Sequence, residues 1–296
     1  MPLVPAAELL HSARVGGYAL GYFESWNLES LHGVVDAAEE TRSPVFIGFN
    51  GEFLTRAGRV TEEPLAWYGA LGRAAAEIAS VPCGLLFNEC SSDVRIREAI
   101  EAGFNLAMLA DPEAPYEKYE RRVAALANLA HGQGAAIEAE LGELPSGSGG
   151  EVIAGRDALT DPDLAAHFVA ATGVDVLDVS VGNVHVMVHG QQSLDLEHLA
   201  KLRARVDTPL GLHGGTGIAP DSLRQAIQIG VVKVAFGTYL KQRYLAALRQ
   251  LLRQEEINPH RLLGMGEQED VMVATRQAVR DAVLERIEML GCCGRA

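Results

Sequence analysis

The sequence predicts an α/β protein in which eight parallel strands close into a (β/α)8 TIM barrel. Eight short apolar runs alternate with stretches of helical spacing within 296 residues, which is the rhythm of a barrel of this kind. No GxGxxG sequence follows the first apolar run, so the main signature of an open dinucleotide-binding sheet is missing. No linker divides the chain. We therefore expect one barrel domain over residues 1–296, with a C-terminal helical segment at about 257–291.

The predicted strands are short and almost continuously apolar, as expected when helices cover one face of a parallel sheet and the barrel interior the other. They are Tyr18–Phe23, Val45–Phe49, Cys83–Phe87, Leu106–Leu109, Ala135–Glu140, Val176–Val181, Leu210–Leu212 and Val232–Phe236.

Helical spacing lies between these strands, for example at Leu28–Glu40, Ser92–Glu101 and Asp221–Ile229. Ser92 or Asp93, Asp161 and Asp221 are the expected N-terminal residues of three helices, because short polar side chains cap exposed backbone N–H groups. Two stretches interrupt the alternation and are predicted loops: residues 144–155 after the fifth strand and residues 186–193 after the sixth.

The composition narrows the classes of function. The formal net charge is −14, which disfavours nucleic-acid binding that depends on neutralising phosphates. No apolar stretch approaches the ~20 residues of a spanning helix, and no secretory signal is apparent. The 4 cysteines form no CxxC pair and no disulfide framework. These features predict a cytoplasmic protein that binds neither nucleic acid nor membrane.

Polar residues collect where the predicted strands end, which is the rim that carries the chemistry of such barrels. Strand three ends in Asn88-Glu89-Cys90, and His185 and His213 follow strands six and seven. Imidazole and carboxylate ligands together suit Zn²⁺. The glycines of HGGTG at 213–217 let the backbone approach a ligand, and N–H groups at a helix N-terminus hold anions.

Several stretches resemble the class II, zinc-dependent ketose-bisphosphate aldolases, in the fructose- and tagatose-bisphosphate branch. The resemblance covers nearly the whole chain. It lies in LVPAAELLHSARVGGYALGYF at the N-terminus, EAELGEL at 138–144, the stretch 159–185, LHGGTGIAP at 212–220 and ERIEMLGCCGRA at the C-terminus.

The resemblance implies a metal site with one altered ligand. Of the three histidines that hold zinc in the family, two correspond to His185 and His213, whereas the first corresponds to Glu89. The family's acid/base aspartate corresponds to Asn88, and asparagine cannot exchange a proton at neutral pH. Glu24, Glu140 and His189 are the candidates for proton transfer in its place.

The substrate-binding residues are only partly kept. The family's phosphate-facing lysine corresponds to His189, and its substrate-gripping asparagine to Ala235. A singly phosphorylated or unphosphorylated substrate therefore fits better than a bisphosphate. The predicted substrate- or phosphate-binding residues are Gly182, His189, Gly214, Gly215, Thr216, Gly237 and Thr238.

We therefore expect a divergent metal-dependent lyase that cleaves or forms a C–C bond in a ketose or related sugar, or its phosphate. Zn²⁺ or another divalent metal would stabilise an enediolate. Catalytic roles are expected for Asn88, Glu140 and Glu24, and metal binding for Glu89, His185 and His213. The resemblance also implies a homodimer or homotetramer. The alternatives are a non-catalytic sugar- or partner-binding protein, or an isomerase or epimerase on the same scaffold.

Overall fold

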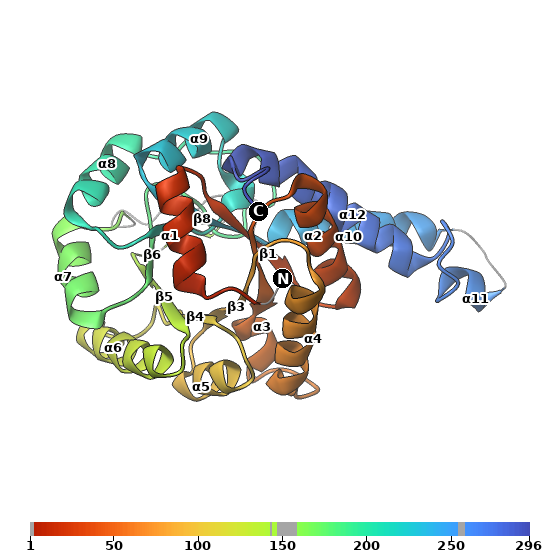
Figure 1. Ribbon diagram of the computed structural model, residues 1–296, viewed down its shortest axis with the longest axis horizontal. Helices are drawn as coiled ribbons and strands as arrows, with labels where there is room; N and C mark the ends of the chain where they lie inside the picture. The colour runs from red at the N-terminus through yellow and green to blue at the C-terminus, as the bar shows by residue number, and fades with distance from the viewer. Residues whose placement is uncertain (1–2, 143, 147–158, 254–257) are drawn as a thin grey trace.

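Eight parallel strands form a closed barrel in sequence order in the computed structural model, and β8 pairs with β1 (Figure 1). The structure describes residues 3–142, 144–146, 159–253 and 258–296. The strands are β1 Leu20–Ser25, β2 Val45–Asn50, β3 Cys83–Cys90, β4 Leu106–Leu109, β5 Ala136–Leu141, β6 Val176–Val179, β7 Leu210–Leu212 and β8 Val231–Phe236. The predicted barrel is confirmed.

Helices surround the strands, and α1 lies across the barrel in the view of Figure 1. The helices that alternate with the strands are α1 Ala6–Gly16, α2 Leu28–Thr41, α3 Gly51–Thr55, α4 Leu65–Ile78, α5 Asp93–Glu101, α6 Tyr116–Gly132, α7 Pro162–Thr172, α8 Leu196–Arg205 and α9 Pro220–Ile229. The C-terminal helices are α10 Thr238–Leu251, α11 Pro259–Leu262 and α12 Val271–Ile287. None of the helices in these described ranges is long and apolar enough to cross a membrane.

Two of the expected helix starts are confirmed and one is wrong. The side chain of Ser92 accepts the N–H of Arg95 at the start of α5, and that of Asp161 accepts two N–H groups at the start of α7. By contrast, α9 begins at Pro220, one residue before Asp221. Proline suits the first helical position, because the N–H that it lacks would have no partner there.

The third strand extends further than its apolar run predicts. β3 continues through Asn88, Glu89 and Cys90, and Asn50 at the end of β2 pairs in register with Asn88. Backbone pairing continues there although the side chains have become polar. The rim of the barrel is therefore built partly from strand residues, which are held more rigidly than loop residues.

Described residues of the two predicted loops, at 144–155 and 186–193, border the barrel rim. Residues 186–193 form an irregular loop in which Gln192 makes an isolated bridge to Ile218. Most of 144–155 lies outside the described residues. At its start, Ser146 bridges to His185 and Pro145 accepts the N–H of His185, so this segment borders the candidate site.

Candidate metal centre and active site

Three predicted metal ligands converge on one point at the rim. Glu89 lies in β3, His185 follows β6 and His213 follows β7. Glu89 Oε1 is 2.7 Å from His213 Nδ1 and 3.0 Å from His185 Nε2. Each of the three offers one ligand atom, and these atoms lie within 4.8 Å of one another. A carboxylate oxygen and two imidazole nitrogens suit Zn²⁺.

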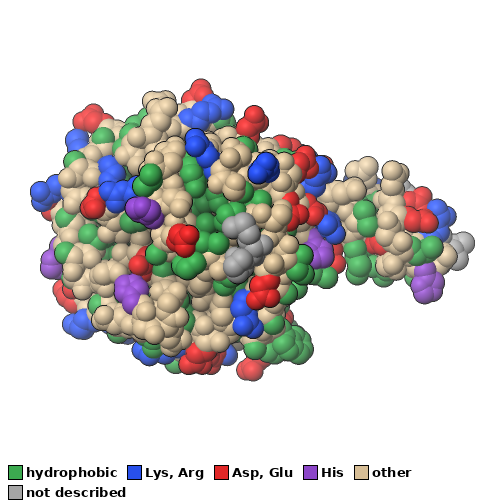
Figure 2. Space-filling view, in the orientation of Figure 1, with side chains coloured by type: hydrophobic (Ala, Val, Ile, Leu, Met, Phe, Trp, Pro, Cys, Tyr) green, Lys and Arg blue, Asp and Glu red, His purple; other side chains and the backbone are tan. Residues whose placement is uncertain are grey.

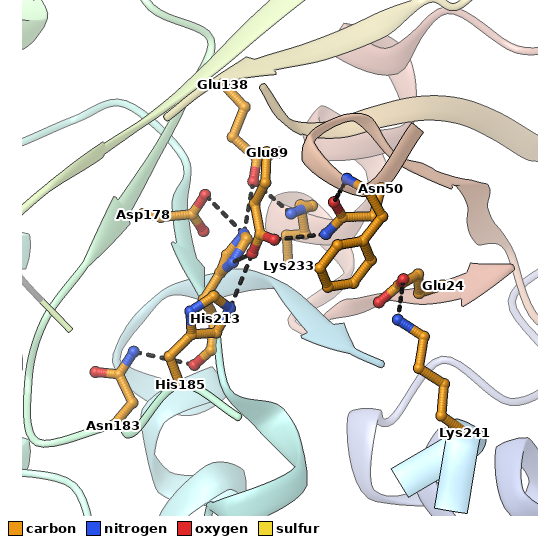
Figure 3. A network of polar contacts seen from close by, with 11 residues as sticks. Glu24, Asn50, Glu89, Glu138, Asp178, Asn183, His185, His213, Lys233 and Lys241 are labelled. Carbon is orange, nitrogen blue, oxygen red and sulfur yellow. Dashed lines mark hydrogen bonds and ion pairs between the residues drawn. The ribbon is translucent and has the colours of Figure 1, made fainter. Parts of the chain in front are cut away.

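The carboxylate of Glu89 is held in place from its far side. Asn50 Nδ2 donates to Glu89 Oε2 at 2.6 Å, while Asn50 Oδ1 accepts the N–H of Phe53 at the start of α3 (Figure 3). Glu89 has a φ of 53°, a left-handed conformation that costs free energy for a residue with a side chain. This conformation lies within the register shift between β3 and β4 and accompanies the turn of the carboxylate toward the histidines.

His213 is fixed at both its ring and its backbone. Below the ring, Nε2 lies 3.4 Å from Glu138 Oε1 and 3.5 Å from Asp178 Oδ2. Asn183 Nδ2 donates to the backbone carbonyl of His213 at 3.0 Å. The ring therefore bridges the metal-ligand cluster above and the carboxylates of the barrel interior below.

A fully buried lysine faces those carboxylates. Lys233 Nζ lies 2.5 Å from Glu138 Oε1, and neither side chain has measurable exposure. Burial lowers the pKa of Lys233, but Glu138 and Asp178 outweigh it, so the pKa is raised and the ammonium form is retained.

Glu89 and His213, which are in contact, carry opposite charges. Burial raises the pKa of Glu89, yet the hydrogen bonds from His185 and His213 dominate and hold it well below its usual range. Burial lowers the pKa of His213, but Asp178, Glu138 and Glu89 raise it well above its usual range. Without a metal, protons therefore stabilise the convergence of these groups.

A cavity of about 250 Å³ opens above this cluster. Asn88 is buried on its wall, and Asn88 Oδ1 has no hydrogen-bond partner among the described residues. Such an orphaned acceptor costs free energy unless a ligand or water satisfies it. Four predicted substrate-binding residues line the same cavity. They are Gly214, Thr216, Gly237 and Thr238.

Glu24 faces the cavity from β1 and is paired with Lys241 of α10, across from Glu89 and His185 (Figure 3). Burial raises the pKa of Glu24, and Lys241 only partly opposes this. The ammonium of Lys241 also lies 4.3 Å from the centre of the Phe53 ring, a cation–π distance. Lys241 thus places a positive charge at the cavity.

Four of the predicted site residues do not line this cavity. Glu140 lines a separate cavity of about 190 Å³ with Asp111 and Tyr119. His189 is exposed, and Gly182 lies in the turn after β6. Gly215 packs behind the lining, where an added Cβ would come within 2.8 Å of the carbonyl oxygen of Ala235.

Sequence reasoning missed Asn50, Asp178, Lys233 and Lys241. A signal for two of them was present, since Asp178 and Lys233 are charged residues within apolar strand runs. Charged side chains are almost never fully buried unless they are paired. Glu138 lies two residues before the predicted Glu140 in β5, and the structure brings Glu138, not Glu140, into contact with His213.

The comparisons with known proteins identify the family to which the chain is similar. The family model described as "Fructose-bisphosphate aldolase class-II" matches residues 4–295. A fructose-bisphosphate aldolase of Geobacillus stearothermophilus is 30% identical over 305 residues, with 100% of this chain and 99% of the relative covered. A probable fructose-bisphosphate aldolase of Bacillus subtilis (strain 168) is 29% identical over 306 residues, with both chains fully covered.

A solved structure also matches over the whole barrel. The crystal structure of the YdjI aldolase from Escherichia coli K12 superposes with a TM-score of 0.81 at 29% identity and covers 99% of both chains. The expected aldolase class of enzyme, an aldehyde-lyase, is confirmed together with the resemblance. The chain belongs to the class-II fructose-bisphosphate aldolase family.

Proposed function

We propose that this chain is a divergent, metal-dependent lyase that cleaves or forms a C–C bond in a ketose or related sugar, or its phosphate. The observation that carries the proposal is the convergence of Glu89 Oε1, His185 Nε2 and His213 Nδ1 beside the cavity. The donor set fits Zn²⁺, although other divalent metals can use the same ligands. A bound metal would polarise the substrate carbonyl and favour enediolate formation.

Glu24 is the best-supported group for proton transfer. It lines the cavity on the side opposite Glu89, and burial raises its pKa, which brings a carboxyl group closer to the range useful in acid/base catalysis. Asn88 can only donate or accept hydrogen bonds. Glu140 and His189 lie outside this cavity.

The cavity suits a substrate with at most one anionic end. Lys241 is its lining cation, and the hydroxyls of Thr216 and Thr238 lie on the same wall. These groups support binding of a single phosphate or carboxylate group. We therefore propose that Lys241, rather than His189, faces the anionic group of the substrate.

The first test is the zinc content of the purified protein, measured by inductively coupled plasma mass spectrometry. One zinc per chain is expected, with loss of zinc in Glu89→Ala and retention in Glu98→Ala, which removes a partly exposed carboxylate of α5. Failure of the wild-type protein to bind zinc, or any other divalent metal offered, would refute the metal-dependent reaction. It would favour a sugar-binding protein on an aldolase scaffold.

The second test separates the reactions open to a loaded enzyme. Ketoses and their monophosphates are incubated with the zinc-loaded protein, and the products are assigned by NMR. Aldehyde products that are absent with Glu24→Gln support C–C cleavage with proton transfer by Glu24. Epimerised or isomerised sugars without aldehyde would assign the chain to the alternative reaction class.

A homo-oligomer is also part of the proposal. In Figure 1 the C-terminal helices form an arm that projects from the barrel, and α11 lies at its far end. The arm carries the exposed apolar side chains of Leu252, Leu263, Met265 and Met272. Figure 2 shows hydrophobic groups on this arm beside charged ones. Exposed apolar groups of this kind favour burial against another subunit. Light scattering during size exclusion tests this, and a monomer at micromolar concentration would contradict it.

A further inference from the structure

We propose that Asp178 and Glu138, with Lys233 as their built-in counter-ion, form a buried positioning layer that presents His213 to the metal. The inference rests on the proposed metal site but concerns residues of the barrel interior that lie outside the substrate cavity. These are positioning residues, because they would act through His213 and do not touch the substrate.

The two ring nitrogens of His213 face different groups. Nδ1 lies toward Glu89 in the metal-ligand cluster, whereas Nε2 lies toward Glu138 and Asp178 (Figure 3). Glu138, held ionised by the Lys233 ammonium 2.5 Å away, can accept a hydrogen bond from His213 Nε2 but cannot donate one. The layer below therefore retains a proton on Nε2, which leaves the Nδ1 lone pair for a metal. Such outer partners fix the ring and the nitrogen used for ligation.

The fold makes specific room for Asp178. Asp178 pairs in register with Gly211 of β7, and a Cβ at position 211 would lie 2.1 Å from Asp178 Oδ1. Asp178 is fully buried, and neither of its oxygens has a conventional hydrogen bond among the described residues. Burying a carboxylate in this way is costly, so a contact with His213 explains its position better than packing does.

The same carboxylates could in principle hold a second metal, since Glu138, Asp178 and His213 offer three convergent ligand atoms. The ammonium of Lys233 argues against this. It lies 2.5 Å from Glu138 Oε1 in a space without solvent, so a divalent cation there would meet a fixed positive charge. Lys233 takes the role that a second metal would have.

The test compares Asp178→Ala and Asp178→Asn with Ser180→Ala, which removes another buried polar atom just beyond β6. Zinc affinity is measured by competition with a chromophoric chelator. Loss of an outer partner typically weakens metal binding ~10–100-fold, and we expect this for Asp178→Ala. Asp178→Asn keeps an acceptor oxygen and should lose less, while Ser180→Ala should bind zinc like the wild type.

A second readout needs no metal and separates this inference from the proposed function. In protein with ¹⁵N-labelled histidine, the Nε2-bound proton of His213 should exchange slowly with water, and faster in Asp178→Ala. If the wild type binds no zinc, the proposed function fails, and this proton still decides the inference. Unchanged proton exchange and zinc affinity in a folded Asp178→Ala protein would overturn it. So would two zinc ions per wild-type chain with the second lost in that variant.

Discussion

Asn50→Ser should weaken zinc binding while leaving the fold intact. The Asn50 amide donates to Glu89 Oε2 at 2.6 Å, and its carbonyl caps α3 through the N–H of Phe53. Serine is a good N-cap but is too short to reach Glu89. The variant therefore removes the donor to the carboxylate and retains the cap, which isolates the contact of interest.

The expected loss of zinc affinity follows from the negative charge of the Glu89 carboxylate that accepts this hydrogen bond. A hydrogen bond to a charged group contributes about 1.5–3 kcal/mol, and ~1.4 kcal/mol corresponds to a tenfold change in affinity. We therefore expect zinc to bind roughly 10–150-fold more weakly, from the same two values. Chelator competition measures this, with Asp270→Ala, which removes the cap of α12 in the C-terminal arm, as the control. Wild-type zinc affinity in a folded Asn50→Ser protein would refute the idea that Asn50 orients Glu89.

Three further predictions test other contacts. Gly237→Ala should lower activity at least tenfold without unfolding the protein, because a Cβ there would lie 2.3 Å from Glu24 Oε2; equal turnover would contradict this. Lys233→Met should reduce the free energy of unfolding in denaturant by about 3–5 kcal/mol, since it leaves buried carboxylates without their cation. Adding Glu138→Gln should restore part of that loss. Asp270→Ala should cost about 0.5–2 kcal/mol as a lost cap of α12. Backbone N–H groups, led by that of Gly266, lower the pKa of Asp270 from 3.8, so its stabilisation is complete above that pH. It should disappear as the pH falls through the lower folded-state pKa, and a difference between the two proteins that persists there would count against the cap.

The barrel could be predicted because the local sequence of each strand is enough to indicate it. Runs such as Val45–Phe49 and Leu106–Leu109 are apolar throughout, which a buried parallel strand requires. The ends of strands were less predictable. β3 continues through Asn88 and Glu89, because its backbone still has a neighbouring strand to pair with. This backbone pairing cannot be inferred from the polarity of the side chains.

The residues of the candidate site could be predicted where a position at a strand end is enough to place them on the rim. Glu89, His185 and His213 could be assigned from the resemblance, and the structure brings them together. Asn50 could not, because its role depends on the distance between the ends of β2 and β3. Lys241 reaches the cavity from within α10, and a lysine in a helix is usually a solvated surface residue.

The changes proposed at the rim from the resemblance would redistribute its charge. Under the proposed correspondence with the family, Glu89 takes the place of a neutral histidine ligand and adds a negative charge. That charge lies near the buried carboxyl groups of Glu138 and Asp178, which contact the same histidine. Lys233 offsets part of this from below, and Lys241 is engaged with Glu24 across the cavity. In the proposed metal-bound state a divalent cation would replace the histidine protons that face Glu89, since a buried anion without a partner is strongly unfavourable. The proposed replacement of an acid/base by Asn88 is therefore compatible with a bound metal, because the groups around Glu89 favour a cation between it and the two histidines.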